Sequence, residues 1–237
     1  MSAQKIGGRT KIVVFTALAI SACSRGDSET AFASSSTAQA TSAVGDASAS
    51  AAAKDAALRL VLASTGNAAR YRVRERLVGH DLPNDAIGET KSLTGVIAID
   101  SAGKVIRDAS KFTVDAGSFV SDKDRRDGFV RGRLLEADQY PSITLVPTEV
   151  RGVSLPLPKS GAVPIEMSAD LTVRGITRAT IWKGSAHFTD GGVAGSAATA
   201  FTFSDIQLEQ PRVPVLLSVA DTIRLELNFN LVPQPRR

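Results

Sequence analysis

Alternation of apolar and polar side chains along short segments is the sequence feature that most restricts the fold of this chain. Every second side chain is apolar in residues 163–173, and the same pattern runs through residues 223–231. Period two places neighbouring side chains on opposite faces of a strand, whereas a helix repeats about every 3.6 residues. Both segments are therefore predicted to be strands with one buried face and one solvated face.

Weaker segments with the same pattern bring the predicted number of strands to eight. They are residues 71–78, 94–100, 111–116, 142–146, 180–188 and 193–203. Glycine-containing turn signals, such as residues 173–175 and 190–192, separate several of them. An antiparallel sheet of this size hides its edges most easily by closing on itself. We therefore predict an all-β fold, an antiparallel eight-stranded barrel, with one short helix within residues 123–136.

The beginning of the chain has the three parts of an export signal. Basic residues precede an apolar run at residues 12–20, which is shorter than the about 20 residues of a membrane-spanning helix. Residues 20–23 (ISAC) resemble the bacterial lipobox, in which the cysteine is acylated and becomes the mature N-terminus. Because Cys23 is the sole cysteine, we expect a signal peptide at residues 1–22 and acylation of Cys23. The alternative is ordinary cleavage with a free thiol left over.

Residues 23–67 are expected to form a flexible tether between this anchor and the barrel domain at residues 68–237. Up to about residue 57 the composition is mainly Ala, Ser, Thr, Gly and Asp, which offers too little apolar area to offset the entropy of ordering. Within the tether, helical spacing of apolar residues predicts a marginal helix at residues 54–62.

Localisation follows from the same signal. We expect a lipid-anchored protein of the cell envelope that faces the periplasm and contacts the membrane through its N-terminal lipid. Ser24 follows Cys23 at the place where inner-membrane retention in enteric bacteria favours Asp, so the outer membrane is favoured.

The positive charge of the chain does not indicate a nucleic-acid partner. The formal net charge is +4, but Lys5, Arg9 and Lys11 lie in the predicted signal, which contains no Asp or Glu. The mature chain therefore carries a net charge of only +1. No run of basic residues interleaved with aromatics remains to follow a phosphate backbone, and we exclude nucleic acid as a partner.

Several motifs resemble, in order and spacing, those of the YceI-like family. They are residues 93–97 (LTGVI), 114–115 (VD), 121–122 (SD), 126–127 (RD), 140–144 (YPSIT) and 170–178 (DLTVRGITR). Members are lipocalin-like antiparallel barrels associated with binding polyisoprenoid and related lipid tails. The resemblance implies a binding protein that sequesters or carries an isoprenoid, quinone-like or other hydrophobic-chain ligand. Residues 128–136 and 203–208 depart from the usual pattern, at positions expected to shape the mouth or depth of the cavity.

The interior of an eight-stranded barrel is either filled by its own side chains or holds one small ligand. The inward faces of the predicted strands are mainly aliphatic and aromatic, which suits a hydrocarbon tail. The expected lining comprises Ile97, Ile99, Phe112, Val114, Ile143, Leu145, Leu171, Val173, Trp182, Phe201, Phe203, Leu225 and Leu227. For the same residues, a packed core without a ligand is the alternative.

Two polar residues are candidates for the mouth of this cavity. His80 lies in a polar loop after the first predicted strand, where it could polarise a ligand head group or simply bond within the loop. Arg126, together with Arg125 and Asp127, could hold a phosphate or quinone head group. The alternative is an Asp127–Arg pair that caps the short helix.

The sequence offers little for catalysis. The only histidines, His80 and His187, are far apart, so no cluster has the spacing of a zinc site. No Gly-x-Ser-x-Gly motif is present, whereas a scattered Ser-His-Asp triad stays open. We expect a metal-free protein that is not an enzyme and has no certain cofactor, with oligomers possible. The alternative function is a non-catalytic interaction or structural domain of the cell envelope.

Overall fold

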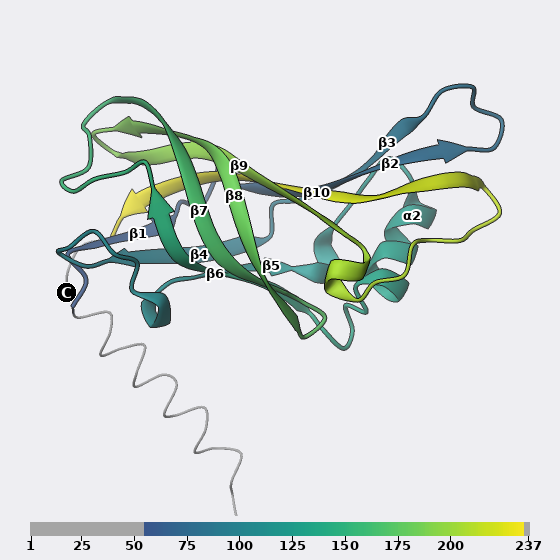
Figure 1. Cartoon of the computed structure of the whole chain (residues 1–237), viewed down its shortest axis with the longest axis horizontal. Coiled ribbons are helices and arrows are strands. Elements are labelled where there is room, and N and C mark those ends of the chain that lie inside the picture. Colours follow the sequence, from purple (N-terminus) through teal and green to yellow (C-terminus); the bar gives the residue numbers. More distant parts are fainter. Residues whose placement is uncertain (1–54, 235–237) are drawn as a thin grey trace, which may run out of the picture. The chain divides into compact units, whose positions relative to one another are not determined.

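The computed structural model describes residues 55–234, which form one antiparallel sheet that curves into a barrel (Figure 1). The predicted signal peptide, Cys23 and most of the predicted tether lie outside the described residues. The strands are β1 (Leu58–Leu62), β2 (Ala68–Leu77), β3 (Asn84–Thr90), β4 (Leu93–Ile99), β5 (Lys111–Asp115), β6 (Ser142–Arg151), β7 (Gly161–Val173), β8 (Ile176–Thr189), β9 (Gly192–Thr202) and β10 (Leu216–Pro233).

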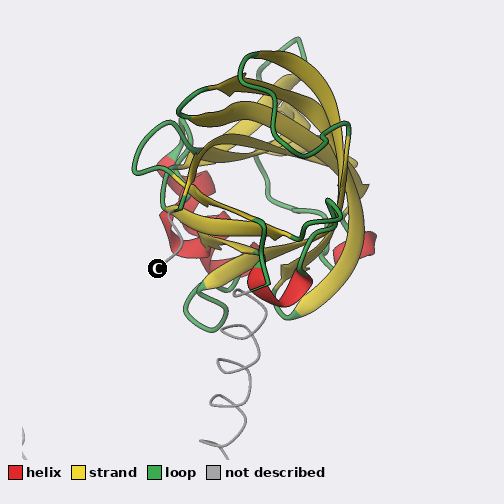
Figure 2. Ribbon diagram, turned by 90° about the vertical axis from the view of Figure 1, so that its left-hand side faces the viewer, coloured by secondary structure: helices red, strands yellow, loops and turns green. Residues whose placement is uncertain are grey.

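Pairing of β1 with β10 closes eight of the ten strands into a ring. The order around the ring is β1-β4-β5-β6-β7-β8-β9-β10, and residues 60–62 pair with residues 231–233 at the closure. Figure 2 shows these strands curving around a common interior. The predicted all-β, antiparallel eight-stranded barrel with one short helix is confirmed.

The hairpin of β2 and β3 extends the sheet outside this ring. β2 pairs with the first part of β10, up to Asn228, and β1 takes over the same edge of β10 from Leu231. In Figure 1 the hairpin projects to the right, on the side where α2 (Asp124–Phe129) also lies. The hairpin therefore widens the sheet at one end of the barrel. At the other end, β1 completes the ring of strands between β4 and β10.

The structure corrects two sequence predictions in this region. Residues 54–62 were expected to include a marginal helix, but residues 58–62 form β1, so the barrel begins at Leu58 and not at residue 68. The alternation of Leu58, Leu60 and Leu62 was the overlooked signal, and hydrogen bonds to both β4 and β10 decide the conformation. β3 was not predicted, because its inward side chains, Ala86, Gly88 and Thr90, are too small or polar to mark a strand.

The predicted short helix is present as six residues of α2, followed by the π-helical segment η3 (Val130–Leu134). The predicted pairing of Asp127 with an arginine is wrong. The buried carboxylate of Asp127 instead accepts hydrogen bonds from the backbone N–H of Ser121 at 2.9 Å and from its hydroxyl at 2.6 Å. These bonds fasten the start of the helix to the preceding loop. Within residues 55–234, no helix is long and apolar enough to cross a membrane.

The closure by β1 yields the first prediction. Leu60 is only 4% exposed and points into the barrel, whereas Arg59 lies on the outer face of the same strand. We expect Leu60→Ala to lower the free energy of unfolding by about 2 to 5 kcal/mol, because it leaves a hole in the core. Arg59→Ala should change it by less than about 1 kcal/mol. Urea unfolding of both variants measures the difference, and equal, small effects would show that β1 is not part of the cooperative barrel.

Candidate functional site

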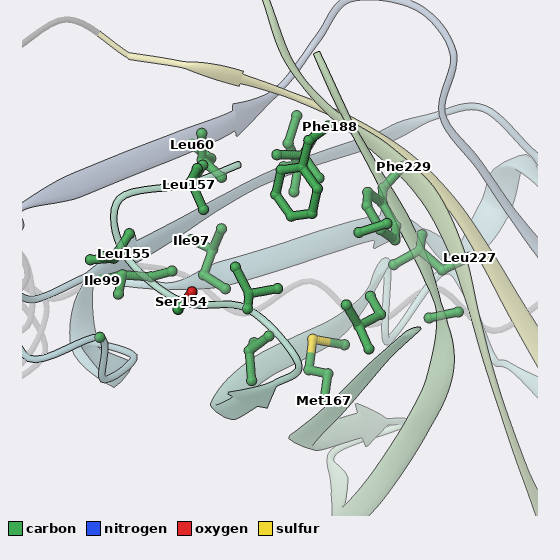
Figure 3. A pocket seen from close by; sticks show the side chains of 18 of the residues that line it. Leu60, Ile97, Ile99, Ser154, Leu155, Leu157, Met167, Phe188, Leu227 and Phe229 are labelled. Atoms are coloured by element: carbon green, nitrogen blue, oxygen red, sulfur yellow. The ribbon is translucent and has the colours of Figure 1, made fainter. Parts of the chain in front are cut away.

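The interior of the barrel contains two apolar cavities, which we name the large chamber and the small chamber. The large chamber has a volume of about 810 Å³ and lies between the barrel wall, the β2–β3 hairpin, α2 and the segment that leads into β10. The small chamber has a volume of about 90 Å³ and is lined by β1, β4 and the loop between β6 and β7 (Figure 3). The interior is therefore not a fully packed core.

All thirteen predicted lining residues lie on the wall of one or both chambers. Ile97 and Ile99 line the small chamber, and Phe112 and Leu227 line both. The large chamber alone is lined by Val114, Ile143, Leu145, Leu171, Val173, Trp182, Phe201, Phe203 and Leu225. Period-two alternation decides which face of a strand points inward, so these side chains share the inner face of the barrel.

The structure adds wall residues that strand alternation did not supply. Phe129, Val130, Leu134 and Leu135 come from the helical segment, and Phe119 precedes it. A second group surrounds the start of β10, namely Ile206, Leu208, Val213 and Val219. The segments that depart from the usual motif pattern, residues 128–136 and 203–208, thus contribute directly to the large chamber, as expected.

Three inward-facing aromatic rings lie over glycines of neighbouring strands, and this arrangement keeps the interior open. The cross-strand pairs are Tyr71 with Gly88, Phe112 with Gly95, and Phe229 with Gly195. A Cβ atom on these glycines would lie 2.2, 2.0 and 2.7 Å from the nearest ring atom, respectively, which is too close for any real contact. Each ring therefore lies against the barrel wall. A side chain larger than that of glycine at the partner position would push the ring into the lumen.

The most buried charged side chains on the wall of the large chamber form an ion pair. Arg126 of α2 donates a hydrogen bond to Glu75 of β2 at 2.6 Å and another to Asp122, and the Arg126 and Glu75 side chains are 14% and 7% exposed. Burial works against the charge of Arg126, but the hydrogen bond to Asp122 and the attraction of Glu75 outweigh it and raise its pKa. The same hydrogen bond lowers the pKa of Asp122. Arg126 is thus a cation already compensated by two carboxylates.

With this geometry, the chain can be compared with known proteins. The model of the YceI-like domain matches residues 72–231. The chain belongs to the YceI-like family. A polyisoprenoid binding domain from Saccharophagus degradans has a similar structure, with a TM-score of 0.57, 15% identity, and coverage of 75% of this chain and 99% of that one. BcnA from Burkholderia cenocepacia has a TM-score of 0.52, 14% identity, and coverage of 71% and 98%. At these identities the likeness concerns the fold alone, and no curated protein matches the sequence significantly.

Tyr71 provides a neutral hydroxyl on the wall of this YceI-like barrel. Its ring centroid lies 5.7 Å from that of Phe119, and its hydroxyl interacts with Ser121. Burial is the main reason that the pKa of Tyr71 is raised to about 12, and Arg126 opposes this shift. Tyr71 therefore stays protonated at any physiological pH.

The two histidines of the YceI-like barrel lie in different surroundings. His80 is exposed in the loop that joins β2 to β3 and lines the rim of the large chamber, and its backbone N–H bonds to Leu77 at 3.3 Å. Both predicted mouth residues, His80 and Arg126, thus line this chamber. His187 is exposed on β8 and is not among the residues that line either chamber. No group of His, Cys, Asp and Glu in residues 55–234 could hold a metal ion.

Tyrosine ionisation tests the burial of the polar wall. The chain has only two tyrosines, so Tyr140→Phe leaves Tyr71 as the sole reporter. We expect its tyrosinate absorbance to appear with a midpoint near 12, and with a midpoint near ~10 in denaturant. Because the folded state holds this proton more tightly, the stability it contributes is present below about pH 10 and is lost as the pH rises through about 12. A folded-state midpoint near ~10 would contradict the burial of this hydroxyl.

Proposed function

We propose that this YceI-like protein is a non-catalytic binding protein that sequesters or carries an isoprenoid or another hydrocarbon-chain lipid in its large chamber. The observation that carries this proposal is an apolar chamber of about 810 Å³ inside the barrel. Ligand sites commonly have volumes of about 300 to 1,000 Å³ and mainly apolar walls. The similar structure named as a polyisoprenoid binding domain supports the same ligand class.

Burial of a hydrocarbon chain would supply the binding energy. Each buried methylene contributes about 0.8 kcal/mol, so one five-carbon isoprene unit contributes about 3 to 4 kcal/mol before the costs of association. The alternative, an interaction domain with a packed interior, does not account for a chamber of this size. No reacting group is needed for binding of this kind.

The buried part of the polar wall, Arg126 and Tyr71, favours a ligand with an uncharged head group, such as a quinone ring or an alcohol, whereas the exposed Arg125 and Lys123 lie at the rim. Glu75 and Asp122 already compensate the charge of Arg126, so a phosphate would have to displace a carboxylate from it. The protonated hydroxyl of Tyr71 is a neutral group that can donate a hydrogen bond to a carbonyl or hydroxyl oxygen.

A substitution that fills the large chamber tests this function. Ile143 of β6 lines the chamber, whereas the adjacent Thr144 does not. We expect Ile143→Trp to weaken binding of an environment-sensitive fluorescent fatty acid to the full chain by at least about tenfold, which corresponds to about 1.4 kcal/mol.

Thr144→Trp on the same strand is the matched control, and it should leave the affinity for the probe nearly unchanged. Native mass spectrometry of the purified full chain provides a second readout of bound lipid. Equal affinities of the two variants, or no probe binding by the unaltered protein, would exclude the large chamber as the binding site.

We further propose that the protein is exported through the signal at residues 1–22 and is anchored by a lipid on Cys23. The lipobox-like sequence before Cys23 supports acylation, and Ser24 supports sorting to the outer membrane. Such an anchor would keep the chamber beside a membrane from which an apolar ligand can be loaded.

Variants of the lipobox region test the anchor. In a Gram-negative host, we expect Cys23→Ala to abolish incorporation of a labelled fatty acid and to release the protein from the membrane fraction. Ser24→Asp is the control, because it should retain the label but shift the protein toward the inner membrane. Persistence of the label in Cys23→Ala would overturn the assignment of the acylated residue.

A further inference from the structure

The two chambers meet at a neck formed by Phe112 and Leu227. These two residues are the only ones that line both chambers of the described barrel, and they are 5% and 6% exposed. Phe112 comes from β5 and Leu227 from β10, two strands that β1 and β4 separate around the ring. The two chambers therefore adjoin at these side chains.

The ring of Phe112 has a position that depends on Gly95. Gly95 of β4 is its cross-strand partner, and a Cβ atom there would lie 2.0 Å from Cδ1 and 2.7 Å from Cε1 of the ring. The ring thus occupies the space that any other residue at position 95 would fill with its side chain. Leu227 has small partners on both of its neighbouring strands, Ala197 and Ala69, so Phe112 is the bulky member of the neck.

The small chamber has the chemistry of a site for a chain end. Its wall consists almost entirely of apolar side chains, including Leu60, Met167, Phe188 and Phe229, and Leu155 and Leu157 of the loop between β6 and β7 add to it (Figure 3). Apolar walls of this kind offer water no hydrogen-bond partners and favour apolar guests. A hydrocarbon tail that passed Phe112 would therefore gain contacts without displacing bound water.

We propose that Phe112, seated over Gly95, determines the length of hydrocarbon chain that the protein accepts. In its present position the ring ends the large chamber and separates it from the small chamber, which is the subsite for the end of a longer chain. This inference rests on the proposed binding function and deepens it by naming the residue that sets chain length.

Two substitutions at the same contact should change chain length in opposite directions. Phe112→Ala removes the ring and joins the chambers, so longer chains should bind better. Gly95→Ala places a methyl group where the ring now lies, so the ring must move into the lumen and shorten the large chamber. General destabilisation cannot produce opposite shifts in length preference.

The experiment measures the affinity of the full chain for a series of all-trans prenyl alcohols, farnesol, geranylgeraniol and solanesol, by displacement of a fluorescent fatty acid. For the unaltered protein, we expect affinity to rise with length and then to level off once the large chamber is full. Phe112→Ala should raise the affinity by at least about tenfold for alcohols longer than the one at which the affinity levels off. Gly95→Ala should lower the affinity by about tenfold for the longest alcohol that the unaltered protein still binds well.

Phe203→Leu is the matched control, because Phe203 lines only the large chamber. It should alter affinity for all lengths alike. If the Phe112 and Gly95 variants also change the affinity for all chain lengths alike, the inference is overturned. Binding of the alcohols by the unaltered protein would still uphold the proposed function. If the unaltered protein binds none of the alcohols, the proposed function fails, and the inference fails with it. Phe112→Leu, which keeps more of the core volume, decides the matter if thermal melting shows that Phe112→Ala is unfolded.

Discussion

The architecture depends on the pairing of β10, an 18-residue strand that serves three neighbours. β9 occupies one edge, while β2 and then β1 share the other. Because β1 replaces β2 along the same edge, the ring closes at one end and opens into a hairpin at the other. This change of partner explains why the small chamber lies beside β1 and the large chamber beside the β2–β3 hairpin. It also leaves no unpaired edge in the ring itself, where an exposed edge would invite association.

An open interior needs wall contacts that replace those of a packed core. Aromatic rings supply some of them here, since each of Tyr71, Phe112 and Phe229 lies over a glycine of the neighbouring strand. The rings keep much of their dispersion contact while the centre of the barrel stays free. Glycine in a strand weakens it, so these positions exchange some strand stability for interior volume.

The sequence predicted the features that depend on local periodicity and missed those that depend on distant partners. Alternation identified the long strands and the faces that point inward, because side-chain direction in a strand follows from position alone. β1 has only five residues, so its alternation is a weak local signal, and its pairing with β4 and β10 decides its conformation. The Glu75–Arg126 pair joins residues 51 positions apart. In the sequence, the only sign of this pair is a glutamate on the same strand face as Val73 and Leu77.

The segments that depart from the usual YceI-like pattern have the most direct bearing on what this barrel can hold. Residues 128–136 place Phe129, Val130 and Leu134 on the large chamber, and residues 203–208 place Ile206 and Leu208 there. These segments supply apolar wall close to α2 and to the start of β10, and the buried cation beside them, Arg126, is bound by carboxylates of this chain. An anion that approached Arg126 would lose part of its hydration and meet a cation that two carboxylates already compensate. A neutral hydrocarbon chain loses no such hydration, so the apolar wall that these segments supply favours ligands recognised by their hydrocarbon length.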